Sequence, residues 1–162
     1  MKHLLILIFL PNLLFAQSYF LKIKTQKQGE LKGESTIQRH IGKIEIIDYS
    51  FEISSLKGTK KSVKPLTIRK HVDGTSTSLY NAFFTNDLIT TLSIESYIPR
   101  KENTVPNLFT ISCKNALVIG IQQIFDPISK KIIEEIAFEI SDFKFENQNN
   151  QSAVESKLNI NN

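Results

Sequence analysis

Regular alternation of apolar and polar residues is the feature that most constrains how this chain can fold. It recurs in six stretches, at residues 18–24, 43–53, 63–72, 88–98, 108–121 and 132–145. A two-residue period turns every second side chain to the same face, which is typical of strands with one buried face. In the fourth stretch, for example, Leu92 and Ile94 alternate with Thr91, Ser93 and Glu95. The chain is therefore predicted to be mainly β.

The phase of this alternation changes inside two of the stretches. In the sequence HIGKIEIIDYSFEI, residues 40–53, the apolar side chains Ile44 and Ile46 occupy even positions, and those from Ile47 onward occupy odd positions. The stretch 132–145 shows a similar change after Ile140. We interpret each change as a bulge or bend within one long strand. Repeated bends favour closure of the strands into a barrel.

One helix is predicted between the third and fourth stretches. In DGTSTSLYNAFFTND, residues 73–87, the Ser and Thr side chains suit a helix N-cap, and Leu79, Ala82 and Phe83 fall on one face. Asn86 is a suitable C-terminal stop. The fold class expected from the sequence is a small antiparallel β-barrel with one flanking α-helix.

The two ends of the chain differ from the part between them. The first 16 residues, MKHLLILIFLPNLLFA, combine an early lysine with an apolar run ending in Ala16, the pattern of a secretory signal peptide. The run is too short to cross a bilayer comfortably, so we expect no membrane segment after processing and predict an exported protein. Residues 17–146 form the predicted barrel domain. The polar, Asn-rich residues 147–162 are expected to form a disordered tail.

The composition offers few groups for catalysis or metal binding. The chain has 162 residues, 41% hydrophobic and 22% charged, which fits one domain with a modest core. Cys113 is the only cysteine, so an internal disulfide is excluded, and its position in an alternating strand favours a buried thiol. His71 and Asp73 offer only two metal ligands where three or four are needed. His40 has no carboxylate nearby in sequence, and we interpret it as a residue that introduces a turn.

No phosphate, nucleophile or nucleic-acid motif is complete. The sequence GES at 33–35 lacks the glycine that a nucleophile elbow needs after its serine, and GTKKS at 58–62 lacks the spacing of a phosphate loop. Six Lys or Arg residues lie within 57–71, but few aromatic residues are interleaved with them. We therefore expect no enzyme activity, no catalytic residue, no metal, no cofactor and no nucleic acid partner.

Several blocks in order carry a resemblance to a known family. They are FLKIK at 20–24, KGES at 32–35, HIGKIEIIDYSFEI at 40–53, LTIRKHVDGTSTSL at 66–79, FTISCKNALVIGI at 109–121 and EEIAFEISDFKFE at 134–146. Together they resemble the Hcp family, the haemolysin-coregulated tube proteins of type VI secretion systems. The resemblance covers nearly all of the chain that follows the signal-like segment.

The resemblance implies a structural role rather than a catalytic one. It implies a homohexameric ring, rings stacked into a tube, and secretion-machine components and effector cargo as partners. Ser50, between two aromatic residues, matches a position that lines the ring lumen and touches cargo. The segment 54–63 matches a loop between subunits, with Ser54, Leu56, Lys57, Gly58, Lys60 and Lys61 as the expected interface residues. A basic loop against the acid-rich C-terminal part of a neighbour is consistent with this use.

The signal-like segment leaves a second hypothesis open. Tube subunits of this family assemble in the cytoplasm, and a different start site would restore that localisation. With the segment present, the alternative is an exported Hcp-like β-barrel that binds a partner and does not polymerise.

Overall fold

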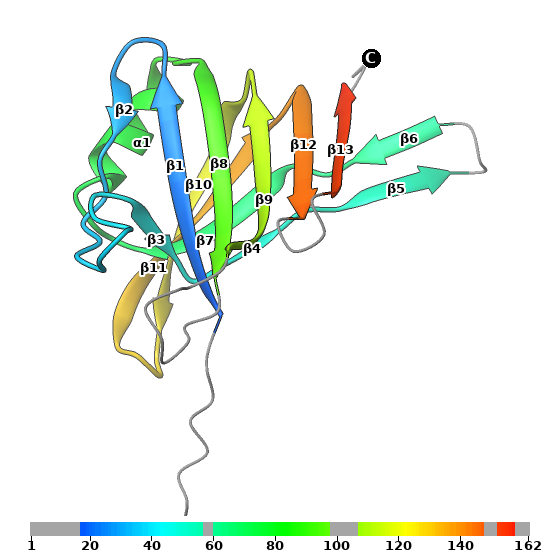
Figure 1. Ribbon diagram of the computed structural model, residues 1–162. Helices are drawn as coiled ribbons and strands as arrows, with labels where there is room; N and C mark the ends of the chain where they lie inside the picture. Colours follow the sequence, from blue (N-terminus) through cyan, green and yellow to red (C-terminus); the bar gives the residue numbers. More distant parts are fainter. Residues whose placement is uncertain (1–16, 57–59, 98–106, 148–151, 158–162) are drawn as a thin grey trace, which may run out of the picture.

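Two β-sheets make up most of the computed structural model, which describes residues 17–56, 60–97, 107–147 and 152–157 (Figure 1). The larger sheet has seven strands in the order β13-β12-β9-β8-β1-β2, with β3 also paired to β1. These strands are β1 (Ser18–Thr25), β2 (Gly29–Leu31), β3 (Ile44–Ile46), β8 (Ile89–Tyr97), β9 (Asn107–Lys114), β12 (Asp142–Asn147) and β13 (Ser152–Lys157).

The smaller sheet has four strands in the order β10-β11-β7-β4. They are β4 (Asp48–Ser50), β7 (Leu66–His71), β10 (Leu117–Asp126) and β11 (Lys131–Glu139). A separate hairpin consists of β5 (Ile53–Leu56) and β6 (Lys60–Val63). All the strand pairs in the described residues are antiparallel.

Three of the predicted long strands are in fact pairs or series of shorter strands. The stretch 43–53 contains β3, which pairs with β1, and β4, which pairs with β7 in the other sheet. The stretches 108–121 and 132–145 likewise divide into β9 and β10 and into β11 and β12. A chain that moves to the opposite sheet must approach the same core from the other side. The predicted bulges are therefore wrong at these points, because each change of phase marks a crossing between sheets.

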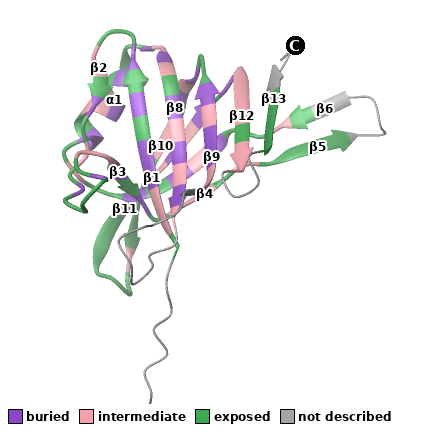
Figure 2. Cartoon of the chain, viewed as in Figure 1, coloured by how far each residue is buried: buried purple, intermediate pink, exposed green. Residues whose placement is uncertain are grey.

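The two sheets pack face to face and bury one hydrophobic core. Leu21, Ile23 and Ile94 of the larger sheet and Ile68 and Phe138 of the smaller sheet are fully buried. Buried residues alternate with exposed ones along the strands, as Figure 2 shows. The predicted mainly-β fold with one flanking helix is confirmed. Across the described residues, the hydrogen bonds run within separate sheets and do not close the strands into one barrel.

Cys113 lies within this core, as its alternation predicted. Its side chain is buried, and burial raises the pKa of the thiol to about 12. A thiol with so high a pKa is almost entirely protonated near neutral pH and is a poor nucleophile.

Helix α1 (Ser76–Phe84) is the predicted helix and packs its apolar side onto the core. Leu79 and Ala82 are buried. The backbone N–H of Thr75 donates a hydrogen bond to Asp73 Oδ1 at 2.9 Å, just before the first turn. The predicted stop is confirmed, since Asn86 has a left-handed φ of 47° two residues after the helix ends.

A buried charged cluster attaches the start of α1 to the smaller sheet. Lys70 Nζ lies 2.7 Å from Asp73 Oδ1 and 3.2 Å from Glu134 Oε2, and it donates to Ser76 Oγ at 3.1 Å. The Ser76 hydroxyl in turn donates to Glu134 Oε2 at 2.6 Å. Lys70 and Glu134 are fully buried, so this cluster ties β7, β11 and α1 together without help from solvent.

The C-terminal segment differs in part from the expected disordered tail. Ser152–Lys157 form β13, which pairs with β12 along its whole length, for example at Phe145 and Val154. Backbone hydrogen bonding to an existing sheet edge orders a strand that has few apolar side chains of its own. The signal-like residues 1–16 lie outside the described residues. Within the described residues, no helix is both long and apolar enough to cross a membrane.

We expect Lys70→Met to destabilise the protein by about 3–5 kcal/mol, because it leaves the Glu134 carboxylate buried without its partner charge. The double variant Lys70→Met/Glu134→Leu removes both charges and should recover most of that loss. Urea unfolding measures the free energy of unfolding of each variant.

The matched control is Arg69→Met. Arg69 pairs with Asp48 on the exposed face of the same strand, and such pairs contribute less than about 1 kcal/mol. Equal losses for Lys70→Met and Arg69→Met would contradict this view of the cluster.

Candidate functional site

The segment predicted to lie between subunits is a two-stranded hairpin that projects from the body of the protein (Figure 1). Its strands pair from Ile53 and Val63 outward to Leu56 and Lys60. The two arms are also joined at the base, since Lys64 Nζ lies 2.7 Å from Glu52 Oε2 and the Lys64 N–H donates to the Glu52 carbonyl. These contacts hold the arms of the hairpin together where it leaves the body.

The expected interface residues are distributed along this hairpin. Ser54 is exposed and pairs with Ser62. Leu56, Lys60 and Lys61 lie in the paired backbone of β5 and β6. Lys57 and Gly58 lie outside the described residues.

Ser50, the predicted lumen residue, lies on the outer face of the smaller sheet. It is exposed, and its row across the strands continues through Thr67, Ala137 and Gly120. All four have small side chains, and a Cβ built on Gly120 would lie 3.9 Å from the Cβ of Ala137. This part of the face is therefore a low surface with no bulky side chain rising from it.

A charged row lies beside the small one on the same face. Asp48, Arg69 and Glu135 are aligned across β4, β7 and β11. Arg69 Nε donates to Asp48 Oδ1 at 2.8 Å, and this hydrogen bond, with the carboxylate charge, raises the pKa of the Arg69 guanidinium. This row is thus polar, and its one positive charge, Arg69, is paired with Asp48.

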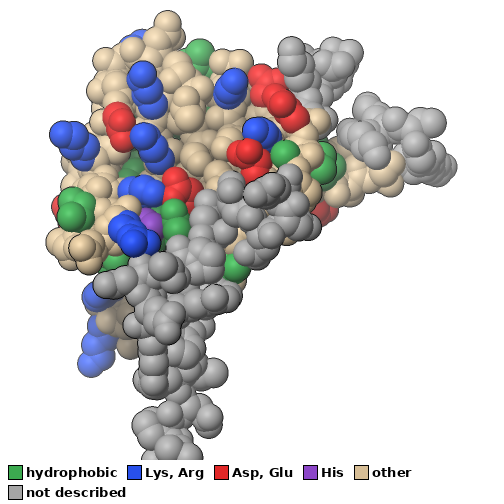
Figure 3. Space-filling view, in the orientation of Figure 1, with side chains coloured by type: hydrophobic (Ala, Val, Ile, Leu, Met, Phe, Trp, Pro, Cys, Tyr) green, Lys and Arg blue, Asp and Glu red, His purple; other side chains and the backbone are tan. Residues whose placement is uncertain are grey.

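The outer face of the larger sheet is also polar. Figure 3 shows basic and acidic side chains interspersed over it. Three ion pairs lie there, Lys22 with Glu30 at 3.4 Å, Lys43 with Glu95 at 2.5 Å and Lys144 with Glu146 at 2.7 Å. The charged rows of both sheets therefore point outward, and the buried apolar rows lie between the sheets.

The structure does not bring His71 and Asp73 together as metal ligands. His71 is exposed, whereas the Asp73 carboxylate faces Lys70 and accepts hydrogen bonds from Thr75. No group of three or more His, Cys, Asp or Glu residues within the described chain could hold a metal ion.

The buried Ser76, Lys70 and Glu134 are residue types that also serve as nucleophile and base in hydrolases. Here the Lys70 ammonium is engaged by two carboxylates, and the Ser76 hydroxyl donates to one of them. A lysine held in this way does not accept a proton from the serine. The cluster therefore supports the helix rather than a reaction.

His40 lies between two turns, in agreement with the prediction, but it is also buried in an aromatic pocket. Its side chain is 5% exposed and its ring stacks on Phe20 with the centroids 3.9 Å apart. The Tyr97 ring packs edge-on against it at 4.3 Å. The Nδ1 atom is buried and has no hydrogen-bond partner among the described residues. The sequence carried no signal for this burial, because the aromatic partners come from β1 and β8.

Burial in this pocket lowers the pKa of His40, and the positive charge of Lys43 lowers it further. Lys43 Nζ lies 2.5 Å from Glu95 Oε2, and the Tyr97 hydroxyl donates to the same oxygen at 2.6 Å. Burial alone would raise the pKa of Glu95, but these two hydrogen bonds bring it below its ordinary value. Burial and the Glu95 carboxylate both raise the pKa of Tyr97.

Acid should therefore destabilise the protein through His40. The unfolded histidine has a pKa near 6.5, and the folded one has a lower value. The stability that depends on neutral His40 is fully present above pH 6.5 and is lost as the pH falls through the folded pKa. The variant His40→Phe keeps an aromatic ring in the stack and does not titrate. We expect the wild type to lose stability relative to His40→Phe as the pH falls below about 6.5, measured by urea unfolding at each pH.

His71→Asn, which removes an exposed histidine, is the control and should follow the wild type. The same pH profile for wild type and His40→Phe would show that His40 is not the titrating group.

A family model described as "Type VI secretion system effector, Hcp" matches residues 20–147. No sequence among curated proteins matches the chain. Solved structures with the same fold include one described as Hcp protein, with a TM-score of 0.78 at 14% identity, covering 90% of this chain and 100% of that one.

Two further structures come from named organisms. The secreted protein Hcp3 from Pseudomonas aeruginosa has a TM-score of 0.74 at 16% identity and covers 88% of this chain and 98% of its own. Hcp1 from Salmonella typhimurium has a TM-score of 0.73 at 19% identity and covers 91% and 99%. These likenesses extend over the two sheets and the helix, and the family match includes the blocks that carried the resemblance in the sequence. The chain therefore belongs to the Hcp family of type VI secretion system effectors.

Proposed function

We propose that this protein is a non-catalytic structural subunit that assembles into a homohexameric ring and a tube of a type VI secretion system. The observation that carries the proposal is the family match over residues 20–147, nearly the whole of the two-sheet body. The β5–β6 hairpin, which belongs to neither sheet and projects from this body, also supports it. The function of such a protein resides in its surfaces.

The outer face of the smaller sheet is the surface we assign to the ring lumen. Ser50 and its neighbours Thr67, Ala137 and Gly120 form a low polar row there. A surface of small side chains allows a folded cargo to pass or to bind weakly. We propose that effector cargo contacts the ring through this row.

The β5–β6 hairpin is the element we assign to contacts between subunits. Its sequence is basic, with Lys57, Lys60 and Lys61, whereas the C-terminal part of the chain from residue 134 carries six acidic residues and two lysines. A basic hairpin favours contact with an acidic surface of the neighbouring copy.

A second function is favoured by one feature of the sequence. The first 16 residues have the composition of a secretory signal peptide, which fits an exported Hcp-like module that binds a partner without polymerising. The mass of residues 17–162 in solution separates the two functions. A stable hexamer supports the ring, and a monomer at high concentration supports the exported module.

We expect shortening of the hairpin to abolish the ring. Replacing residues 54–62 with Asn-Gly joins Ile53 to Val63, which are already paired, through a tight turn that suits a two-residue hairpin. The shortened protein should be monomeric by light scattering after size exclusion, at concentrations where the full protein is hexameric.

Circular dichroism and urea unfolding of the shortened protein provide the control, because β5 and β6 lie outside both sheets and their loss should leave the body folded. A shortened protein that still forms hexamers would remove the hairpin from the interface.

A further inference from the structure

The apolar inner face of the larger sheet continues beyond the smaller sheet that covers it. One row of directly paired residues runs across five strands, from Leu21 through Ile94, Ile111 and Phe145 to Val154. The exposed fraction rises along this row from 0% at Leu21 and Ile94 to 39% at Phe145 and 63% at Val154. In strands β12 and β13, the face that is buried in the rest of the sheet is therefore exposed.

The smaller sheet likewise extends beyond the part that the larger sheet covers. Phe125 pairs with Ile132, and the N–H of Val72 donates to the carbonyl of Ile132, so these residues form one row across β10, β11 and β7. On the same face, two residues further along each strand, lie the buried Lys70 and Glu134. The row formed by Phe125, Ile132 and Val72 therefore lies on the core side of the sheet. Yet Val72, Ile132 and Phe125 are 48%, 45% and 63% exposed.

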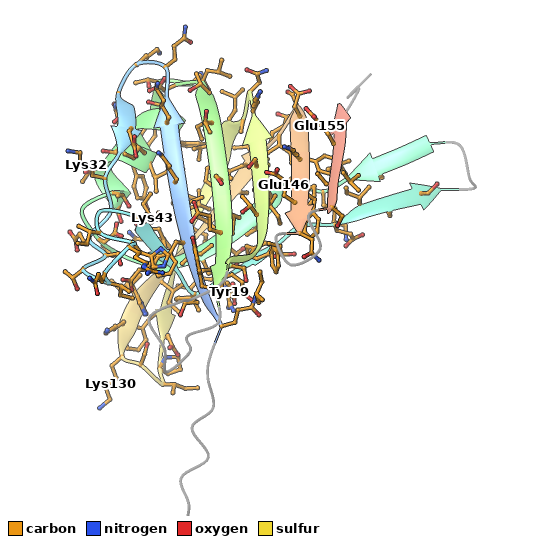
Figure 4. All side chains as sticks on the ribbon, in the orientation of Figure 1. Tyr19, Lys32, Lys43, Lys130, Glu146 and Glu155 are labelled. Atoms are coloured by element: carbon orange, nitrogen blue, oxygen red, sulfur yellow. The ribbon has the colours of Figure 1, made fainter. Side chains whose placement is uncertain are left out.

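The two open faces lie on opposite sides of the molecule. Figure 4 shows Lys130 at the far end of the β10–β11 hairpin, with Glu146 and Glu155 of β12 and β13 across the body of the protein. One face belongs to the larger sheet and the other to the smaller sheet. Within one chain they cannot cover each other, whereas between two chains each supplies the layer that the other lacks.

We propose that the β10–β11 hairpin of one copy packs against the inner face of β12 and β13 of the next copy. The open face of the smaller sheet then covers the open face of the larger one, and the two-layer packing continues from subunit to subunit. The inference rests on the proposed ring, and it names the second surface of that contact. The occupant of each face is another copy of this chain.

Charge supports this occupant. The turn of the β10–β11 hairpin exposes Lys130 and Lys131, while the Asp126 carboxylate is engaged by the backbone N–H groups of Ile128 and Ser129. Glu155 is exposed on β13. Glu155 lies on the edge strand, on the opposite face from Val154, and the lysines of a turn that reaches past this edge can pair with it.

The geometry also determines the kind of symmetry. The two faces differ, so the contact is heterologous. When two copies bind, one keeps an unused β10–β11 face and the other keeps an unused β12–β13 face. A heterologous contact generates a closed ring if the rotation between copies closes, and an open filament if it does not. It does not generate a two-fold dimer.

The first test places a charge on each face. Ile132→Lys and Val154→Lys should each lower the mass of the assembly to that of a monomer at concentrations where the wild type is a ring. Phe84→Lys alters a still more exposed apolar residue at the end of α1 and should leave the ring unchanged. Circular dichroism checks that each variant is folded.

The second test identifies which faces meet. Ile128→Cys and Val154→Cys each add one exposed thiol, and the native Cys113 is buried, so the wild type is the control. With a short bismaleimide, a mixture of the two variants should give covalent dimers, and either variant alone should give at most the wild-type background. Cross-linking of one variant with itself, to the same extent as the mixture, would overturn the heterologous contact.

The outcomes also separate this inference from the function on which it rests. A wild type that is monomeric would overturn both. A ring retained by both lysine variants would overturn only the pairing of these two faces and would leave the tube function standing.

Discussion

The face-to-face packing of the two sheets is the interaction on which the rest of the structure depends. The chain passes between the sheets at β3 to β4, at β9 to β10 and at β11 to β12, so the sheets cannot separate without disrupting these passages. Large side chains such as Leu21, Ile68 and Phe138 are fully buried between them. Burial of each contributes about 1.5–3 kcal/mol relative to exposure. Since the described residues contain one short helix and the chain has only one cysteine, most of the stability must come from this contact.

The buried polar groups near the core are accommodated in two different ways. At the start of α1, Lys70 and Glu134 are buried together and satisfied by Ser76 and Asp73. Beside β1, His40 is buried with one ring nitrogen unpaired, so its neutral form is the one that the pocket accepts. The first arrangement depends on charge and the second on its absence. The two sites therefore stabilise different elements by different means.

The local pattern predicted the elements better than it predicted their partners. Strands β1, β7 and β8 and helix α1 follow from alternation, helical spacing and the Asn86 stop. The change of phase at Ile47 was visible as well, but a bulge and a crossing have the same signature along the sequence. Only the pairing partner distinguishes them, and pairing is a long-range property. β13 was missed for a related reason, since it is ordered by the edge of β12 rather than by its own composition.

The family resemblance singled out some surface residues, but the burial and exposure of others could not be predicted from the sequence. The resemblance assigned Ser50 and the hairpin, and the structure describes Ser50 as exposed and the hairpin as projecting, which is the geometry those proposed roles need. The burial of His40 and the open rows at Val154 and Ile132 depend on how far each sheet extends relative to the other. Composition and periodicity carry no information about that offset, since an apolar residue has the same pattern whether its cover belongs to its own chain or to another.

The offset between the sheets gives the structure a consequence that a fully closed sandwich would lack. If both sheets ended together, their inner rows would be covered and the chain would bury its apolar surface alone. Here the larger sheet extends at β13 and the smaller at the β10–β11 hairpin, so apolar surface is left open at two unlike places. Contiguous exposed apolar surface of this kind is uncommon on a monomer and marks a site of association. Because the two places differ, association through them adds copies in one direction, which is the property that a ring or a stacked tube requires.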